Sequence, residues 1–308
     1  MIERRPAAAC RALAAVVLLA LGGVLLGAQA GPGTEKDPLE QWRDVLRYGI
    51  ESEVLKVLQS IAGQGEEGLD AEMVQLLQSS LSPAVRLAVL RVFTERPGTA
   101  AESTAVQMLR EEQGENPELS VALMAYLAAI ASRGAEDRLQ QLVDDRSDRV
   151  AEGAIGALAR TGGESSAALL LQRLEDPAYP EERKPELILA LGKLRYAGAA
   201  EALLGILDSR DLPRVWRMYA ASSLGEIGDP AAVAPLKALF AEQDALVRAY
   251  AAAAMARFSM SEVEPLLQQG LRDSNVRVRL AAAQALATPE ARASVDILVY
   301  KARHDPER

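Results

Sequence analysis

The side chains that most often carry out catalysis are nearly absent from this sequence. Its 308 residues include one cysteine, Cys10, and one histidine, His304, which lies four residues from the C-terminus. A Ser-His-Asp triad, a Cys-His pair or a histidine-based zinc site needs a firmly positioned histidine, and terminal residues are usually mobile. We therefore predict that the protein is not an enzyme and holds no metal and no cofactor.

The sequence also lacks the motifs that bind phosphate or calcium. No GxxxxGK[ST] or GxGxxG follows a predicted strand, and the acidic residues lack the spacing of a calcium loop. Two carboxylates can in principle perform glycosidase-type chemistry, but no pair stands out. The polar residues that recur at a fixed spacing are amides instead: Gln107, Gln141, Gln172 and Gln269. An amide both donates and accepts hydrogen bonds, so a row of amides can bind the backbone of an extended chain.

The elements that must position these amides form a repeat of about 31 to 35 residues. Clear copies read WRMYAASSL from Trp216 to Leu224, VRAYAAAAM from Val247 to Met255 and VRLAAAQAL from Val278 to Leu286. The last residues of all copies, here called the repeat-end residues, are Leu58, Phe93, Leu127, Leu158, Leu191, Leu224, Met255 and Leu286. The apolar spacing within each copy fits one face of a helix.

A second helix is predicted after each copy. Breaks follow the copies at Thr161-Gly162-Gly163, Tyr196-Ala197-Gly198 and Gly228-Asp229-Pro230, where glycine permits the left-handed conformation that ends many helices. Aliphatic or aromatic residues then occur one helical turn apart in these pairs: Leu139 and Val143, Leu170 and Leu174, Leu203 and Leu207, Leu236 and Phe240. Neither helix can bury its apolar face alone, so neighbouring pairs must stack on each other.

The four glutamines belong to the second helices, fourteen residues after a repeat-end residue. That position points away from the aliphatic pair, so we expect these glutamines to be exposed, with Gln75 extending the row. Gly205 and Ala238 take the same position in two repeats and leave a gap for a bulky side chain. The alternative interpretation is that glutamine is simply a good helix former on a solvated face.

Other recurrent residues have structural explanations. Aspartates near the ends of second helices fit turns and helix caps, and they are Asp144, Asp176, Asp208, Asp244 and Asp273. Arginines at the second position of the copies can link repeats through hydrogen bonds, and they are Arg86, Arg217, Arg248 and Arg279. Trp216 takes the apolar first position of its copy, which predicts core packing, and Trp42 fits an amphipathic terminal cap.

The segment LGEIGDPAAVAPLKAL, from Leu224 to Leu239, resembles the consensus of bacterial HEAT repeats. The resemblance extends from about Pro38 to the C-terminus and is strongest from Val150 onward. It implies an all-α fold, a right-handed α-α superhelix of about eight helix pairs over 38–304, with a divergent first repeat at 38–80 and a tail at 305–308. It also implies that the exposed side of the second helices, with the glutamine row, lines the concave surface of the stack. A scaffold that binds a protein or peptide is the function that it implies. HEAT-like repeats occur in phycobilin lyases too, so a lyase-like protein that binds a small ligand is an alternative.

The first thirty residues resemble a secretory signal peptide. Arg4, Arg5 and Arg11 precede an apolar run from Ala12 to about Leu26, and Gly27-Ala28-Gln29-Ala30 follows it. We predict a signal peptide at 1–30, a short linker at 31–37 and an exported, periplasmic protein with no membrane insertion after cleavage. An uncleaved N-terminal membrane anchor is the alternative.

The acidic balance of the chain excludes some partner classes. The formal net charge is −9, and removal of residues 1–30 would leave 31 basic and 42 acidic residues. Proteins that bind nucleic acid usually carry a basic surface, so we expect no nucleic-acid partner. The sequence favours a non-enzymatic scaffold of the bacterial cell envelope that binds a protein or peptide, with a purely structural envelope component as a further alternative.

Overall fold

The computed structural model describes residues 37–64 and 68–306, and every regular element within them is a helix. The chain divides into a unit that ends at Trp42 and a unit Arg43–Arg308. The described part of the former unit is residues 37–42, in which α2 (Pro38–Tyr48) begins. The predicted signal peptide, its apolar run and nearly all of the predicted linker lie outside the described residues.

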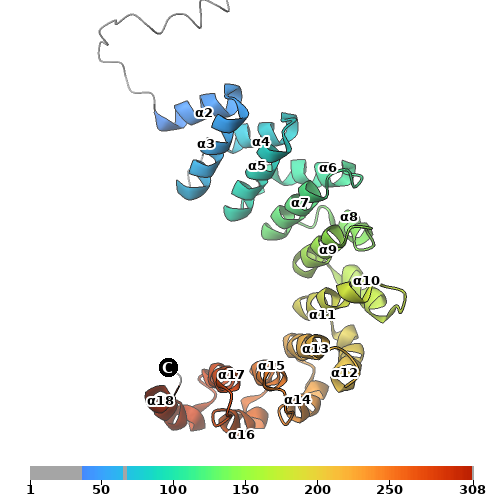
Figure 1. Ribbon diagram of the computed structural model, residues 1–308, viewed down its shortest axis with the longest axis vertical. Coiled ribbons are helices and arrows are strands. Elements are labelled where there is room, and N and C mark those ends of the chain that lie inside the picture. The colour runs from blue at the N-terminus through green and yellow to red at the C-terminus, as the bar shows by residue number, and fades with distance from the viewer. Residues whose placement is uncertain (1–36, 65–67, 307–308) are drawn as a thin grey trace, which may run out of the picture. The chain divides into compact units, whose positions relative to one another are not determined.

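Within residues 37–64 and 68–306, eight helix pairs follow α2; Figure 1 shows how they are arranged. The first helices of the pairs are α3 (Glu51–Gln64), α5 (Pro83–Glu95), α7 (Pro117–Ala129), α9 (Asp148–Thr161), α11 (Lys184–Lys193), α13 (Arg214–Ile227), α15 (Ala245–Met255) and α17 (Val276–Leu286). The second helices are α4 (Asp70–Ser79), α6 (Glu102–Glu111), α8 (Glu136–Leu142), α10 (Glu164–Glu175), α12 (Ala200–Asp208), α14 (Val233–Leu239), α16 (Met260–Gly270) and α18 (Val295–His304). This arrangement confirms the predicted solenoid of helix pairs.

The core consists of the residues that the repeat identified. Every repeat-end residue is buried, with at most 3% of its surface exposed. The aliphatic pairs of the second helices are buried as well, from Leu139 and Val143 to Leu236 and Phe240. Trp216 is 8% exposed, which confirms its predicted place in the core. Burial of one such side chain contributes about 1.5–3 kcal/mol, so stacking supplies the stability that an isolated pair lacks.

Consecutive first helices pack much more closely than consecutive second helices. A Cβ atom on Gly192 of α11 would lie 2.6 Å from the Cα of Ser223 of α13, and one on Gly225 would lie 3.0 Å from the Cα of Ala254 of α15. Within Arg43–Arg308, closer spacing in one row bends the stack toward that row. The first helices therefore line the concave side, as Figure 1 shows.

Arginine side chains link the last repeats in a regular series. The guanidinium group of Arg248 donates to the carbonyl oxygens of Glu242 and Gln243 at 2.7 and 2.8 Å, and to both carboxylate oxygens of Asp273 at 2.9 Å. Arg279 repeats this pattern with the carbonyl of Asp273 and the carboxylate of Asp305. We call these contacts, with the ion pair between Arg217 and Glu242, the arginine ladder. They confirm the predicted links between repeats at Arg217, Arg248 and Arg279, whereas Arg86 makes no ion pair in the described residues.

The ends of the helices follow the predictions in part. Asp244 caps α15 by accepting from the backbone N–H groups of Leu246 and Val247, and Gly228 ends α13 with φ 76°. The expected left-handed glycine is wrong at Gly162, where φ is −68°. A Cβ there would lie 2.7 Å from the carbonyl oxygen of Leu158, so this glycine permits a close approach instead.

Candidate binding groove

Several exposed or partly exposed positions of the first helices carry small side chains. Ala88, Ala122, Ala125, Gly153, Gly156 and Ala253 all lie at least partly exposed on α5, α7, α9 and α15. The repeat explains this composition, because close packing of consecutive first helices requires small residues on their flanks. The surface of the first helices is therefore shallow at these positions.

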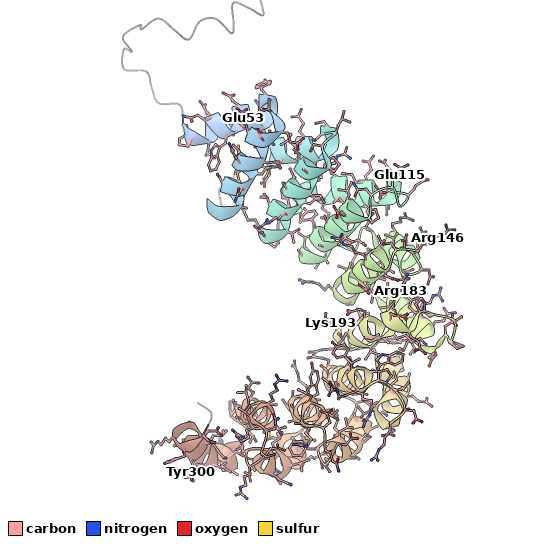
Figure 2. All side chains as sticks on the ribbon, in the orientation of Figure 1. Glu53, Glu115, Arg146, Arg183, Lys193 and Tyr300 are labelled. Atoms are coloured by element: carbon pink, nitrogen blue, oxygen red, sulfur yellow. The ribbon has the colours of Figure 1, made fainter. Side chains whose placement is uncertain are left out.

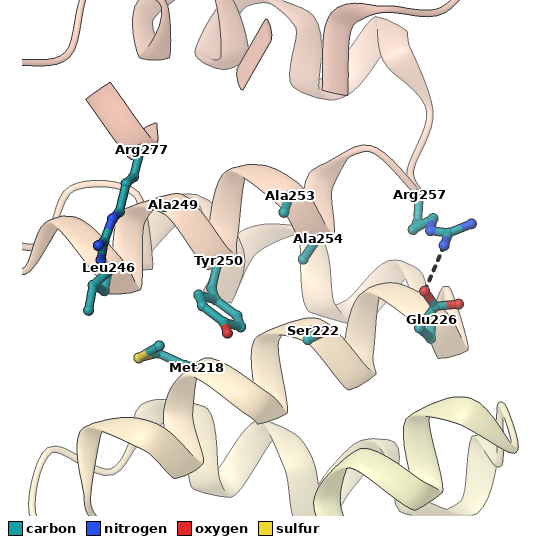
Figure 3. A pocket seen from close by; sticks show the side chains of 10 residues that line it. All are labelled: Met218, Ser222, Glu226, Leu246, Ala249, Tyr250, Ala253, Ala254, Arg257 and Arg277. Carbon is teal, nitrogen blue, oxygen red and sulfur yellow. Dashed lines mark hydrogen bonds and ion pairs between the residues drawn. The ribbon is translucent and has the colours of Figure 1, made fainter. Parts of the chain in front are cut away.

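A groove with a volume of about 650 Å³ lies between α13 and α15. Its walls include Met218 and Tyr250, whose side chains point into the space between the two helices, and Leu246 (Figure 3). Its floor consists of Ser222, Ala249, Ala253 and Ala254. Large anchors above a floor of small residues are typical of a surface that receives apolar side chains of a partner.

Tyr250 of the groove wall packs against Tyr219, which takes the equivalent position of the preceding repeat. Tyr219 and Tyr250 are the fourth residues of their copies, and their ring centroids lie 6.4 Å apart with an angle of 47° between the rings. Both side chains are partly exposed. A tilted pair of this kind is a favourable aromatic arrangement, which gives the groove a stable wall.

Charged groups stand at the two ends of the groove. At one end Glu226 accepts from Arg257 at 2.7 Å, and Arg195 lies 3.6 Å from the same carboxylate. At the other end Arg277 extends from the first turn of α17 toward Leu246 (Figure 3). Within the described residues Arg277 makes no ion pair, whereas Glu226 has two partners. The groove and its immediate surroundings therefore carry more positive than negative charge.

The glutamine row has a different place from the one predicted. Gln107, Gln141, Gln172 and Gln269 are exposed on second helices, as is Gln75. The prediction that this row lines the concave side is wrong, because the stack bends toward the first helices. Figure 2 shows the two faces through Lys193 of α11 on the inner side and Arg146, after α8, on the outer side.

Two of the predicted amides already have partners within the chain. Gln107 donates to Glu111 at 2.8 Å, and Gln141 accepts from Arg138 at 3.1 Å. Whether the row binds anything stays a prediction, and it does not contribute to the groove.

A neighbouring set of amides links the second helices to one another. Gln140 donates to the hydroxyl of Ser166 at 2.9 Å, and Gln268 donates to the hydroxyl of Ser294 at 2.9 Å. In both cases a glutamate four residues earlier, Glu136 or Glu264, accepts from the same serine. These contacts lower the pKa of Glu136, mainly through the hydrogen bond from Ser166. Their role is to hold adjacent repeats together.

Sequence reasoning missed the groove although part of its signal was present. The fourth positions of WRMYAASSL and VRAYAAAAM carry Tyr219 and Tyr250, whereas several other copies have a small residue there, such as Gly153 or Ala281. Aromatic residues at this position in two adjacent repeats indicate a local site. Reading the signal as a groove required knowing that these positions face outward on the concave side.

The described residues contain no helix long and apolar enough to cross a membrane. They also contain no group of three or more histidine, cysteine, aspartate or glutamate side chains that could hold a metal ion.

Comparison with known proteins identifies the family. The family model described as spirochaete HEAT repeat protein matches residues 46–308, and the chain belongs to this family of HEAT-repeat proteins. A search of curated proteins found no match.

Solved structures show the same fold. A Kap121p mutant is 13% identical with a TM-score of 0.52, and the match covers 85% of this chain and 35% of the Kap121p chain. Kap95p, from a structure with RanGDP, is 15% identical with a TM-score of 0.50, and the match covers 80% of this chain and 40% of the Kap95p chain. The CpcE–CpcF complex of a phycocyanin lyase from Nostoc is 17% identical with a TM-score of 0.46, and the match covers 85% of this chain and 100% of the lyase chain. At these identities the likeness concerns the fold alone, and the fold is one that suits a protein-interaction scaffold.

Proposed function

We propose that this protein is a non-enzymatic scaffold that binds a protein or peptide on its concave side, in the groove between α13 and α15. The observation that supports this most directly is the groove itself, which has a volume of about 650 Å³ and is lined by the largely buried Met218, the partly exposed Leu246 and Tyr250, and several small residues. Kap95p, a neighbour in fold, binds RanGDP, which is consistent with a protein partner.

The mechanism of binding is preorganisation. The groove is formed by two first helices whose backbones are fixed by close packing, as at Gly225 against Ala254. The ion pair between Glu226 and Arg257 and the pair of tyrosine rings further restrict the walls. A rigid surface loses little conformational entropy on binding, so more of the contact energy appears as affinity.

Crosslinking from the groove tests this proposal. A photoreactive amino acid at Ala253, which is exposed within the groove, should give an adduct with a partner in the native cell envelope. The same group at Gln172, exposed on the second-helix face, should give none. Adducts from Gln172 alone would transfer the site to the glutamine row, and adducts from neither position would contradict the scaffold.

Affinity for the purified partner then tests the groove residue by residue. Tyr250→Ala should weaken binding at least about tenfold, because buried tyrosines dominate many interfaces. Tyr48→Ala, at a tyrosine that is 81% exposed outside the groove, is the matched control and should leave binding unchanged. The double variant Gln141→Ala with Gln172→Ala should also bind normally and melt normally. A bound chromophore in the purified protein would instead support the lyase-like alternative.

We propose further that the protein acts outside the cytoplasm, in the cell envelope. Support comes from residues 1–30, in which a basic start, an apolar run and small residues at 28 and 30 match an export signal. N-terminal sequencing of the protein purified from the envelope should find a new start after Ala30. An intact Met1 in that fraction would favour the N-terminal membrane anchor.

A further inference from the structure

The charged groups around the groove indicate the chemistry of its partner. Among the groove-lining residues Arg257 and Arg277 carry positive charge and Glu226 carries negative charge. Arg195 adds a further guanidinium group at 3.6 Å from the Glu226 carboxylate. Three cations thus surround one anion, in a chain whose formal net charge is −9. A positive site attracts acidic partners by electrostatic complementarity.

Within the described residues no ion pair accounts for the position of Arg277. It lies in the first turn of α17, just after the N-cap Asn275. The positive end of the helix dipole lies at that terminus, so a cation there destabilises the helix slightly. Arg279, two residues later, is used by the arginine ladder, whereas Arg277 is exposed and points toward Leu246 in the groove (Figure 3).

Resting on the proposed function, we infer that the groove binds a linear segment of another protein in which an apolar side chain stands close to a carboxylate. The apolar side chain packs between Met218 and Tyr250 over the small floor. The carboxylate of the partner accepts hydrogen bonds from the guanidinium group of Arg277, which presents a planar fork suited to carboxylates. The Glu226–Arg257 pair at the opposite end limits the groove and disfavours a second acidic group next to Glu226.

Selection from a library of random linear peptides tests this inference directly. Wild-type protein should enrich peptides that carry Asp or Glu close to Leu, Met, Phe or Tyr. Arg277→Glu should weaken binding of the best such peptide at least about tenfold. A peptide in which Lys replaces that acid should bind the Arg277→Glu variant better than it binds the wild type. Folding is not at risk, because a carboxylate at a helix N-terminus is favourable.

Arg146→Glu is the matched control. It makes the same change of charge at an exposed arginine on the second-helix side (Figure 2), and we expect it to leave both the selected sequences and their affinities unchanged. Equal weakening by Arg146→Glu would reveal a nonspecific effect of net charge and would overturn the inference.

The two proposals fail in distinguishable ways. Enrichment of basic or neutral peptides, or acidic peptides that bind Arg277→Glu as well as wild type, would overturn the acidic-apolar specificity and leave the groove as a binding site. Enrichment of no peptide, together with no crosslink from Ala253, would overturn both.

Discussion

The arginine ladder should contribute measurably to stability, and its middle member offers the sharpest test. Arg248 and Asp273 are joined by two hydrogen bonds of 2.9 Å, and their side chains are only 15% and 14% exposed. Arg248 also satisfies two backbone carbonyls of the preceding loop. Replacement by methionine keeps much of the volume and removes all of these contacts.

The expected loss of unfolding free energy in Arg248→Met lies between the values for exposed and for fully buried ion pairs. Exposed ion pairs contribute about 0–1 kcal/mol, while breaking a fully buried pair costs about 3–5 kcal/mol. Hydrogen bonds to charged groups contribute about 1.5–3 kcal/mol. For a largely shielded, bidentate pair we expect Arg248→Met to lower the free energy of unfolding by about 3 kcal/mol. A double-mutant cycle with Asp273→Asn should assign about 2 kcal/mol of this to the pair itself.

Urea unfolding followed by far-UV circular dichroism measures both quantities. The midpoint should fall in Arg248→Met with little change in slope, because the surface exposed on unfolding is nearly the same. The matched control is Arg149→Met, whose ion pair with Glu118 is 62% exposed on both sides, and it should change stability by at most about 0.5 kcal/mol. A coupling energy below about 0.5 kcal/mol between Arg248 and Asp273 would refute the view that the ladder holds the repeats together.

Two further predictions concern acid and packing. The hydrogen bonds from Arg248 hold the pKa of Asp273 below its usual value. The stability that this carboxylate contributes is therefore complete above the unfolded pKa of about 3.9 and is lost as the pH falls through the lower folded pKa. Urea midpoints should drop in this acid range, with a smaller drop in Asp273→Asn, and equal drops would contradict the assignment. Gly192→Ala should destabilise the protein by about 2–3 kcal/mol, because the new Cβ would lie 2.6 Å from the Cα of Ser223. Gly205→Ala, whose Cβ would have no atom within 4 Å, should stabilise it by about 0.5–1 kcal/mol. Thermal melting of the two variants measures the difference, and melting temperatures that rise in both would show that α11 and α13 are not in contact.

The core could be predicted from the sequence because burial follows the helical period. Leu224 and Met255 lie 31 residues apart because each ends an equivalent copy of the repeat. Both are buried because that position faces the core in each equivalent helix. The aspartate caps and the arginine contacts were also predictable as types of interaction, because they act over one or two turns or between equivalent positions. Asp244 and Arg248 show this directly.

The candidate site depended on relations between repeats that the one-dimensional pattern does not contain. Gln141 and Gln172 were correctly predicted to be exposed, but their side of the stack was wrong. The sign of the curvature follows from which helices approach more closely, and this is set by contacts such as that of Gly225 with Ala254.

The sequence by itself therefore determined the helices, their pairing and their buried faces, because these depend on the periodicity within one repeat. Only the tertiary structure decided that the first helices line the concave side and that Met218 and Tyr250 face one groove with Arg277 at its end. The physical reason is that a groove is defined by distances between side chains of different repeats. Those distances result from the packing of whole helices, to which every residue along the interface contributes.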